Sequence, residues 1–422
     1  MVVGKMSEIT TYEKTKDSGI EWIGSVPSHW RVHTFYQLVT QVKEKNSNLQ
    51  EKNLLSLSYG KIKRKDIDSP DGLLPASFDG YNIIEDGDIV LRLTDLQNDH
   101  TSLRVGLATE RGIITSAYTT LRPIDTSNSK YLYYLLHAFD LKKGFYGMGS
   151  GVRQGLNYAE VKELRVVLPG QDEQNAIVRF LDNQCGQIDS IIEEAKSSIE
   201  EYKKWRASII FEAVTKGLNP LAEMKDSHID WIGLVPSHWK LSRIKNELDN
   251  LDYLREPISA EKRENILGLY DYYGASGVID KIDDYNVDDK VLLIGEDGAN
   301  LRMRNLPLVY KAEGKFWVNN HAHILKVHDD NCYGFIAYLL EAGDYSVFIT
   351  GSAQPKLSQF NLMRFPIVIP PLVEQQEIEA YLDEKCSAID ALIREKKSLL
   401  SELEIYKRSL ILETVTGKRK VV

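Results

Sequence analysis

The chain has 422 residues, of which 43% are hydrophobic, so we expect two or more domains with sizeable cores. No apolar run approaches the roughly 18 residues that a membrane helix needs, and the N-terminal residues lack the apolar stretch of a signal peptide. We therefore predict a cytoplasmic protein. The formal net charge of -9 would argue against a nucleic-acid-binding protein if the charge were evenly spread.

The charge is uneven, because much of the acid lies in two long stretches that repeat each other. Other segments are locally basic, such as KIKRK at Lys61–Lys65 and LRMR at Leu301–Arg304. The cysteines Cys185, Cys332 and Cys386 form no CxxC pair, so we interpret them as reduced thiols and expect no structural metal. Nucleic-acid binding thus stays open for individual segments.

A short segment occurs twice, since WIGSVPSHW at Trp22–Trp30 returns nearly unchanged as WIGLVPSHW at Trp231–Trp239. The repetition indicates an internal duplication. A Ser-His pair in each copy suggests a nucleophile and a base, but neither copy has an acid partner or an oxyanion signature, which argues against catalysis. We interpret the tryptophans as aromatic anchors, with Pro27 and Pro236 setting the turn, that seat each module on a common frame.

A second repeat is longer, since Pro169–Lys216 aligns without a gap on Pro370–Gly417 at an offset of 201 residues. In each copy the expected helix starts just after a proline, contains no internal proline and repeats apolar residues at three- and four-residue steps. We expect each helix to have about 45 residues and to pack on the other in a coiled-coil-like manner. In the alternative, each helix covers only its own domain. The predicted apolar stripes are Ile177, Leu181, Ile188, Ile191, Ala195, Ile199, Tyr202, Trp205 and Ile209 in the first helix, and Ile378, Leu382, Ile389, Leu392, Leu399, Leu403, Tyr406 and Leu410 in the second.

Two segments of similar size but different sequence lie between the repeats, at 31–168 and 240–369. Both mix strand-like runs, DGDIVLRL at Asp86–Leu93 and KVLLIGEDG at Lys290–Gly298, with turn-rich loops. We predict α/β or α+β domains with helices at Ser129–Phe139 and Tyr333–Leu340. Each segment ends alike, with a Gly-Ser loop, a short polar helix and a strand that leads into the proline of the long helix.

This layout resembles the DNA-specificity (S) subunit of type I restriction-modification systems. The motifs that carry the resemblance are the two WIG segments, GSGVRQGL and GSAQPKL near the ends of the variable segments, and LPGQDEQNAIVRFLD and IPPLVEQQEIEAYLD at the starts of the long helices. The ordered combination is specific and covers nearly the whole chain, although each motif alone is weak.

The resemblance implies an α+β fold with two α/β-type target-recognition domains separated by two long helices, packed as an antiparallel coiled coil with a pseudo-twofold internal repeat. The first recognition domain would span 1–168, including the segment 17–30, and the central helix 169–219. The second recognition domain would span 220–369, including the segment 226–239, and the last helix 370–422.

The resemblance further implies a non-catalytic subunit, in which each recognition domain reads one half of an asymmetric, bipartite duplex DNA site. Its partners would be two methyltransferase subunits, which modify adenine, and restriction or motor subunits, which cleave and translocate DNA. The chain itself would hold no cofactor, whereas the partners would use S-adenosylmethionine, ATP and Mg. The helices would set the gap between half-sites, so inserting whole turns near Lys216–Asn219 should change that gap.

Candidate DNA contacts lie in loops that mix small, amide and cationic residues. Asn and Gln can pair with adenine, Arg and Lys with guanine or phosphate, and glycines let the backbone approach phosphate. The candidates of the first domain are Lys61, Lys63, Arg64, Lys65, Arg92, Thr94, Gln97, Asn98, Arg104, Ser150, Arg153 and Gln154. Those of the second domain are Tyr273, Ser276, Asn300, Arg302, Arg304, Asn319, Asn320, His321, Ser352, Gln354 and Lys356.

Each candidate loop also has a structural interpretation. YYGASG at Tyr272–Gly277 and GEDGAN at Gly295–Asn300 suit tight turns, and KIKRK suits a solvated face. HAH at His321–His323 suits a metal site only with further ligands, and GMGSG at Gly147–Gly151 is a weak likeness to a cofactor loop.

Two other classes of function stay open. One is a single-chain methyltransferase or nuclease, against which count the missing GxxxxGK[ST], HExxH and Asp/Asn-Pro-Pro-Tyr/Phe motifs. The other is a coiled-coil scaffold that binds no DNA, against which counts the presence of two dissimilar domains on one repeated frame.

Overall fold

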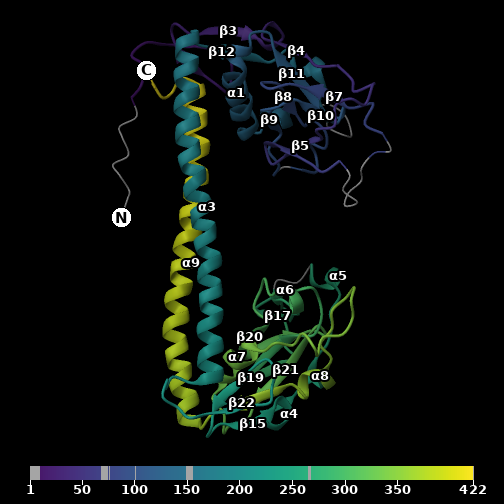
Figure 1. Cartoon of the computed structure of the whole chain (residues 1–422), viewed down its shortest axis with the longest axis vertical. Helices are drawn as coiled ribbons and strands as arrows, with labels where there is room; N and C mark the ends of the chain where they lie inside the picture. Colours follow the sequence, from purple (N-terminus) through teal and green to yellow (C-terminus); the bar gives the residue numbers. More distant parts are fainter. Residues whose placement is uncertain are drawn as a thin grey trace. The chain divides into compact units, whose positions relative to one another are not determined.

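The computed structural model describes residues 10–67, 75, 77–99, 101–148, 155–264 and 268–421. The chain divides into two compact units, one formed by Met1–Ala195 with Ser398–Val422 and the other by Lys196–Lys397. The boundary falls inside both long helices, so each unit combines one globular part with one half of each helix. Figure 1 labels the helices and strands.

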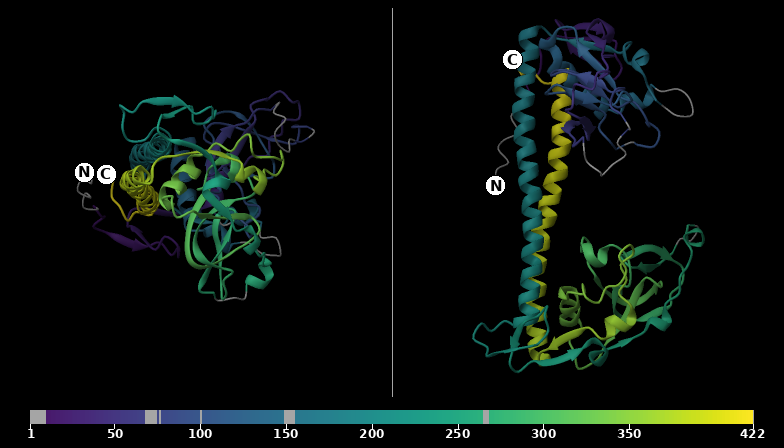
Figure 2. Two further views of the ribbon diagram at one scale, coloured as in Figure 1. Left: turned by 90° about the horizontal axis from the view of Figure 1, so that it is seen from below. Right: turned by 45° about the vertical axis from the view of Figure 1, so that its right-hand side comes forward.

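The two long helices are α3 (Gln171–Lys216, 46 residues) and α9 (Leu372–Val415, 44 residues), close to the lengths expected from the sequence. Within each unit their halves lie side by side and run antiparallel (Figures 1 and 2). In the first unit Lys407 Nζ lies 2.5 Å from Asp189 Oδ1, and in the second Arg206 Nε lies 3.2 Å from Asp390 Oδ1. The offset of 201 residues converts one ion pair into the other, so both units contain the same contact between the two helices.

Most of the predicted apolar stripe is buried, including Ile177, Leu181 and Ile188 of α3 and Ile378, Leu382 and Ile389 of α9, but four predicted positions are not. Ile191, Trp205, Leu392 and Tyr406 are exposed, by 43%, 53%, 38% and 39% of their surface. The neighbouring Ile192 and Ile393 turn inward instead, with Ile188 and Ile389. Periodicity alone could not choose between adjacent apolar residues, because both fit a helical repeat. The helices therefore carry one buried apolar face and a second, exposed set of large apolar side chains.

The first unit is built from short antiparallel sheets that pack on α1 (Ser129–Leu141). Helix α1 has ten buried residues, including Tyr131 and Leu135, and shares its core with Ile177 of α3 and Val415 of α9. The largest sheet has the order β4-β11-β8-β9, of strands Val39–Gln41, Thr119–Pro123, Ile89–Leu91 and Val105–Leu107. The pairs are β1–β2 (Thr15–Asp17, Ser25–Pro27), β3–β12 (Arg31–Thr34, Arg165–Leu168), β5–β6 (Leu55–Ser58, Lys61–Arg64) and β7–β10 (Asn82–Ile84, Gly112–Ile114); helix α2 is Tyr158–Val161.

The second unit has one six-stranded sheet covered by α7 (Tyr333–Ala342). Its strand order is β16-β21-β19-β20-β17-β18, and all neighbours are antiparallel except β17 and β20. These strands are Leu248–Asn250, Ala322–Val327, Val287–Gly295, Val309–Val318, Tyr270–Gly274 and Gly277–Ile282. The pairs are β13–β14 (Met224–Asp226, Leu234–Pro236) and β15–β22 (Lys240–Arg243, Pro366–Ile369); short helices are α4 (Ile244–Glu247), α5 (Ala260–Arg263), α6 (Asn300–Met303) and α8 (Gln359–Met363).

The WIG segments anchor the helix ends, as expected from their tryptophans. Trp30 and Trp239 are buried. His29 Nε2 donates to Glu173 at the start of α3, and His238 Nε2 to Glu374 at the start of α9, both over 2.8 Å. Each segment thus contacts the first turn of the helix that follows its own variable segment.

Trp239 and Trp30 also lie close to the C-terminal ends of α3 and α9, respectively. Helix α3 is followed by Gly217 at φ +73°, and α9 by Gly417 at φ +70°, a left-handed conformation that ends a helix and favours glycine. A Cβ on Gly217 would lie 3.3 Å from Trp239, and a Cβ on Gly417 only 2.3 Å from Pro27. Close backbone approach at both helix ends therefore requires glycine.

His137 of α1 makes the stability of the first unit depend on pH. Its side chain is buried and its Nδ1 has no hydrogen-bond partner among the described residues. Burial, together with the positive charges of Lys407 and Arg408, lowers the pKa of His137 to about 4. Because the unfolded pKa is about 6.5, the unfolded chain binds more protons between these values, and stability is lost as the pH falls.

We expect the free energy of unfolding of the first unit to fall by up to about 3 kcal/mol between roughly pH 6.5 and pH 4 through His137. In His137→Gln this part of the pH dependence should vanish, as measured by denaturant unfolding of the full chain followed by circular dichroism. The control is His228→Gln, because the His228 side chain is 83% exposed. Equal pH slopes in the wild type and His137→Gln would contradict the assignment.

Candidate nucleic-acid interface

Four loops that the sequence singled out in the second unit meet at one place. Glu296 N donates to His321 O over 2.8 Å, and Gly298 N donates to Pro355 O over 3.0 Å. Asn319 N donates to Tyr273 O over 3.1 Å, and a Cβ on Gly295 would lie 2.6 Å from Ala275 O. The segments Tyr272–Gly277, Gly295–Arg304, Asn319–His323 and Ser352–Lys356 therefore form one continuous surface, which we call the loop cluster.

A buried polar network supports the loop cluster from below. Glu296 is 8% exposed and accepts from Arg255 over 2.5 Å and from Lys356 over 3.0 Å. Burial alone would raise the pKa of Glu296, but the hydrogen bonds from Lys356 and Arg255 hold that pKa below its usual value. The start of the loop that begins with Glu296 is thus fixed to Arg255 and to Lys356 by charge-assisted hydrogen bonds.

His323 continues this network. It is fully buried, its Nδ1 lies 2.7 Å from Asp252 Oδ2 and its Nε2 lies 2.8 Å from Leu357 O. Both ring nitrogens thus lie within hydrogen-bonding distance of an oxygen atom. Burial favours a raised pKa for Asp252, but the hydrogen bond and charge of His323 outweigh it and the pKa is lowered. His323 therefore serves the fold, whereas the exposed His321 binds a different carboxylate, Asp297, over 2.8 Å.

Several predicted contacts lie on the outer surface of the loop cluster. Asn320, His321, Arg302 and Lys356 are exposed. Arg302 makes one long hydrogen bond, to Gly351 O at 3.3 Å. Also exposed on these loops are Ser276, Ser352 and Gln354, while Tyr273 is half-buried against Phe316. Cationic, amide and hydroxyl groups are therefore presented together, which is the chemistry that base edges and phosphates require.

Three predicted contacts of the second unit turn out to be structural. Asn319 is 6% exposed and its Oδ1 accepts from His321 N. Asn300 holds the turn that follows it, donating to Leu306 O and Pro307 O and accepting from Leu306 N. Arg304 donates to the carbonyls of Glu341 and Gly343 at the end of α7. Their polar groups bind the backbone, which gives these side chains a role in holding the loops, and contact with DNA stays a prediction.

In the first unit the structure brings together the basic segment Lys61–Lys65 and the loop after β8. A Cβ on Gly60 would lie 3.0 Å from Leu103, which places the β5–β6 turn against that loop. Lys61, Lys63 and Lys65 are exposed and make no ion pair with any residue that the structure describes. Arg64 differs, because it forms a two-pronged ion pair with Glu110. On the loop, Thr94, Gln97 and Asn98 are exposed, and Arg92 lies 3.5 Å from Asp99.

Arg104 is the clearest correction in the first unit. It is fully buried, and its guanidinium donates to the carbonyls of Arg92, Thr94, Asp95 and Asp99 and to the hydroxyl of Tyr146. Arginine has five N–H donors in a fixed fork, and here each one has an acceptor. Arg104 therefore shapes the loop from inside and is not available to DNA. Ser150, Arg153 and Gln154 lie outside the described residues.

Sequence reasoning missed Tyr59 and Tyr253, whose side chains are 79% and 78% exposed. Tyr59 occupies the β5–β6 turn, and Tyr253 precedes the Arg255 that binds Glu296. A tyrosine beside a lysine-rich strand was a readable signal for Tyr59, whereas the position of Tyr253 depends on the fold.

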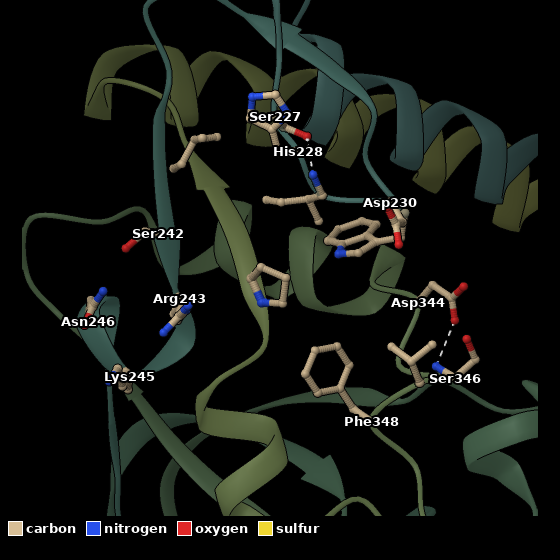
Figure 3. A pocket seen from close by; sticks show the side chains of 15 residues that line it. Ser227, His228, Asp230, Ser242, Arg243, Lys245, Asn246, Asp344, Ser346 and Phe348 are labelled. Atoms are coloured by element: carbon tan, nitrogen blue, oxygen red, sulfur yellow. Dashed lines mark hydrogen bonds between the residues drawn. The ribbon is translucent and has the colours of Figure 1, made fainter.

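A pocket of about 800 Å³ in the second unit lies away from the loop cluster, beside the segment Ser227–Trp231 (Figure 3). Arg243 and Lys245 line one side and Asp344 and Phe348 the other. In the first unit Arg165 stands at the strand position equivalent to Pro366 and donates to Gly19 O over 3.2 Å.

The residues that the structure describes include no cluster of His, Cys, Asp or Glu suited to a metal ion. Within the same residues, no helix combines the length and hydropathy needed to span a bilayer. The three cysteines are buried and form no disulfide bond.

Comparisons with known proteins point to one family. Residues 236–402 match the model of the type I restriction modification DNA specificity domain. The chain is 33% identical over 146 residues to a type I restriction enzyme specificity subunit of Haemophilus influenzae, covering 34% of this chain and 36% of that one. It is 30% identical over 119 residues to the MjaX specificity subunit of Methanocaldococcus jannaschii, covering 28% and 26% of the two chains. The matched part therefore spans about a third of these relatives or less.

The fold has a counterpart over nearly its full length. A chain from the structure described as "Structural basis underlying complex assembly and conformational transition of the type I R-M system" superposes with a TM-score of 0.67 at 14% identity. The match covers 92% of this chain and 98% of that one. The likeness confirms the predicted fold class, and the family match confirms the resemblance stated from the motifs.

The role of Arg104 can be separated from that of the exposed arginines. Arg104→Ala leaves four carbonyls and a hydroxyl without their donor, so we expect the first unit to lose about 3 kcal/mol or more of its free energy of unfolding. The control Arg302→Ala removes one exposed, long hydrogen bond and should cost less than about 0.5 kcal/mol. Chemical denaturation measures both values, and equal stability of the two variants would refute the structural role.

Proposed function

We propose that this chain, whose residues 236–402 form a type I restriction-modification DNA specificity domain, is the DNA sequence-recognition subunit of such a system. It binds an asymmetric, bipartite DNA site, one half through each unit, and directs adenine methylation and DNA cleavage by partner subunits. The proposal implies a cytoplasmic protein, because its substrate is cellular DNA.

The convergence of four loops in the second unit is the observation that carries the proposal. These loops are far apart in sequence, lie within the matched domain and present Arg302, Asn320, His321 and Lys356 together. Direct reading of nucleobase edges requires exposed donors on a rigid, hydrogen-bonded support. A mobile loop would lose conformational entropy on binding, which weakens the affinity. The first unit supports a second reading surface with Lys61, Lys63 and the loop that Arg104 shapes.

Catalysis is assigned to the partners. The sequence carries neither the tetrapeptide of adenine methyltransferases nor a phosphate loop for ATP. The methyltransferase subunits would supply S-adenosylmethionine chemistry, and the restriction subunits ATP-dependent translocation and Mg-dependent cleavage. This chain would contribute sequence choice and no reacting group.

The exposed apolar side chains of the helices support a partner in two copies. The offset of 201 residues relates Ile191 to Leu392 and Trp205 to Tyr406, and all four are substantially exposed. Large aromatic and aliphatic side chains left in water favour a protein partner. Because the first unit holds Ile191 and Tyr406 and the second holds Trp205 and Leu392, each unit has one member of each pair. Two methyltransferase subunits would suit this repetition.

Methylation mapping of the host genome tests the proposal. We expect a bipartite, adenine-methylated motif that disappears when the gene is deleted and returns when it is restored. Exchanging residues 31–168 for the equivalent segment of another family member should change one half-site only. Methylation that is unchanged by the deletion would refute the function, and a change in both half-sites would refute the division of labour.

The helix pair is proposed to set the gap between the half-sites. Insertion near Lys216–Asn219 is unsuitable as a test, because Gly217 packs against Trp239 there. A cleaner test inserts one heptad after Ala195 in α3 and one after Lys397 in α9, which keeps the Asp189–Lys407 and Asp390–Arg206 pairs.

We expect these matched insertions to lengthen the gap by about 10 Å, or about 3 base pairs, with both half-sites unchanged in the methylated motif. Inserting the heptad into α3 alone is the control, since it breaks the register of the helix pair and should abolish methylation. Altered half-sites with an unchanged gap would rule the model out.

A further inference from the structure

The β5–β6 hairpin of the first unit ends in an unusual turn. Ser58 pairs with Lys61, so Tyr59 and Gly60 form a two-residue connection, with φ of +49° and +76°. Positive φ at both positions is the type I′ turn, which favours Asn-Gly and Gly-Gly. A tyrosine in the left-handed region is strained, because its Cβ crowds the backbone.

The strain at Tyr59 is not offset by packing, because the side chain is 79% exposed. An asparagine would relieve the turn and reduce the exposed apolar surface. Backbone strain that persists without a local benefit points to a role in binding. Tyr59 therefore stands at the tip of the hairpin as an aromatic side chain without a hydrogen bond or ring contact to any residue that the structure describes.

The two faces of the hairpin have opposite chemistry. Leu55, Leu57 and Ile62 belong to a buried cluster, and a Cβ on Gly106 would lie 2.5 Å from Leu57, so this face is held against the sheet. The opposite face carries Lys61 and Lys63, paired with Ser58 and Ser56, and Lys65 continues it. Alternation along a strand places residues 61, 63 and 65 on one side, about 6.7 Å apart.

This face is an uncompensated positive surface on a chain of net charge -9. Arg64 lies on the other face of the strand, where Glu110 neutralises its charge. Lys61, Lys63 and Lys65 make no ion pair with a described residue. Lysines held in a row without carboxylates favour a polyanion. A two-stranded β-ribbon also has the width that the major groove of duplex DNA admits.

We propose that the β5–β6 hairpin is the element of the first unit that enters the major groove of duplex DNA. Tyr59 contacts bases or sugars at the tip, and Lys61 and Lys63 bind phosphates along one strand. This inference rests on the proposed function and goes beyond it by naming the element and the aromatic contact. Arg104 and the loop that it shapes then serve as the support beside the hairpin.

The experiment measures binding of the full chain, with its methyltransferase partner, to a duplex that contains the mapped site, by fluorescence anisotropy over a series of salt concentrations. Tyr59→Asn is the main variant, since asparagine suits the turn and the protein should melt at the same or a higher temperature. We expect its affinity for DNA to fall about 5- to 100-fold with an unchanged salt slope. Tyr59→Phe, which keeps the ring, should bind within about threefold of the wild type.

The lysines have a different signature. Removing two phosphate contacts in Lys61→Ala/Lys63→Ala should reduce the slope of log K against log salt by about 1.8. Lys14→Ala/Lys16→Ala is the matched control, because these lysines are exposed, lie two residues apart at β1 and make no ion pair with a described residue. The control should leave both affinity and slope nearly unchanged.

The outcomes separate this inference from the function on which it rests. If the wild type binds the site and Tyr59→Asn and the double lysine variant bind equally well, the hairpin proposal is wrong while the function stands. If those variants keep DNA binding but lose the methyltransferase subunit in a pull-down, the hairpin is a protein-docking element and the proposal is overturned. If the wild type with its partner binds no duplex, the proposed function fails and the hairpin proposal fails with it.

Discussion

The structure depends on the mutual burial of two long helices. Neither α3 nor α9 can hide a stripe that includes Ile188 or Ile389 by itself, and each unit solves this by pairing half of one helix with half of the other. The ion pairs of Asp189 and Asp390 with Lys407 and Arg206 set the antiparallel register. Because both units pair the helix halves in the same way, the globular parts attached to them are free to differ. Under the proposed function, two unlike surfaces on one repeated frame suit recognition of an asymmetric site.

The loop cluster shows how a protein fixes the positions of exposed polar side chains. Four charged or titratable side chains hold the loops in place and are largely buried, namely Asp252, Glu296, Arg255 and His323. Their mutual neutralisation lets Arg302, Asn320 and Lys356 face solvent from fixed positions. In the first unit a single buried cation, Arg104, holds a loop in the same way by donating hydrogen bonds to four of its carbonyls.

Much of the frame could be predicted from sequence, but less of the site. The helices, the modules and the anchoring tryptophans follow from repetition, proline placement and apolar period, which are local signals. The choice of Ile192 over Ile191 was not predictable, since both satisfy the period and only packing decides. Among candidate contacts, residue type could not tell the buried Arg104 and Asn319 from the exposed Arg302 and Asn320, because that difference depends on partners distant in sequence. Tyr59 could have been noticed from its place beside the lysine-rich strand, but its left-handed φ of +49° is visible only in the structure.

The first unit is assembled from two parts of the chain that are far apart in sequence, and this constrains how the chain can fold during synthesis. Leu410, Ile411 and Val415 of α9 belong to the same core as α1 and the start of α3, and Lys420 N donates to Thr10 O over 2.7 Å. Ile177 and Leu181 therefore keep an uncovered apolar face until residues some 230 positions later emerge from the ribosome. The second unit, continuous from Lys196 to Lys397, has no such delay. The order of maturation is thus the reverse of the order of synthesis: the unit made later can complete its core first, and the unit made first must wait with its half of the helix pair exposed.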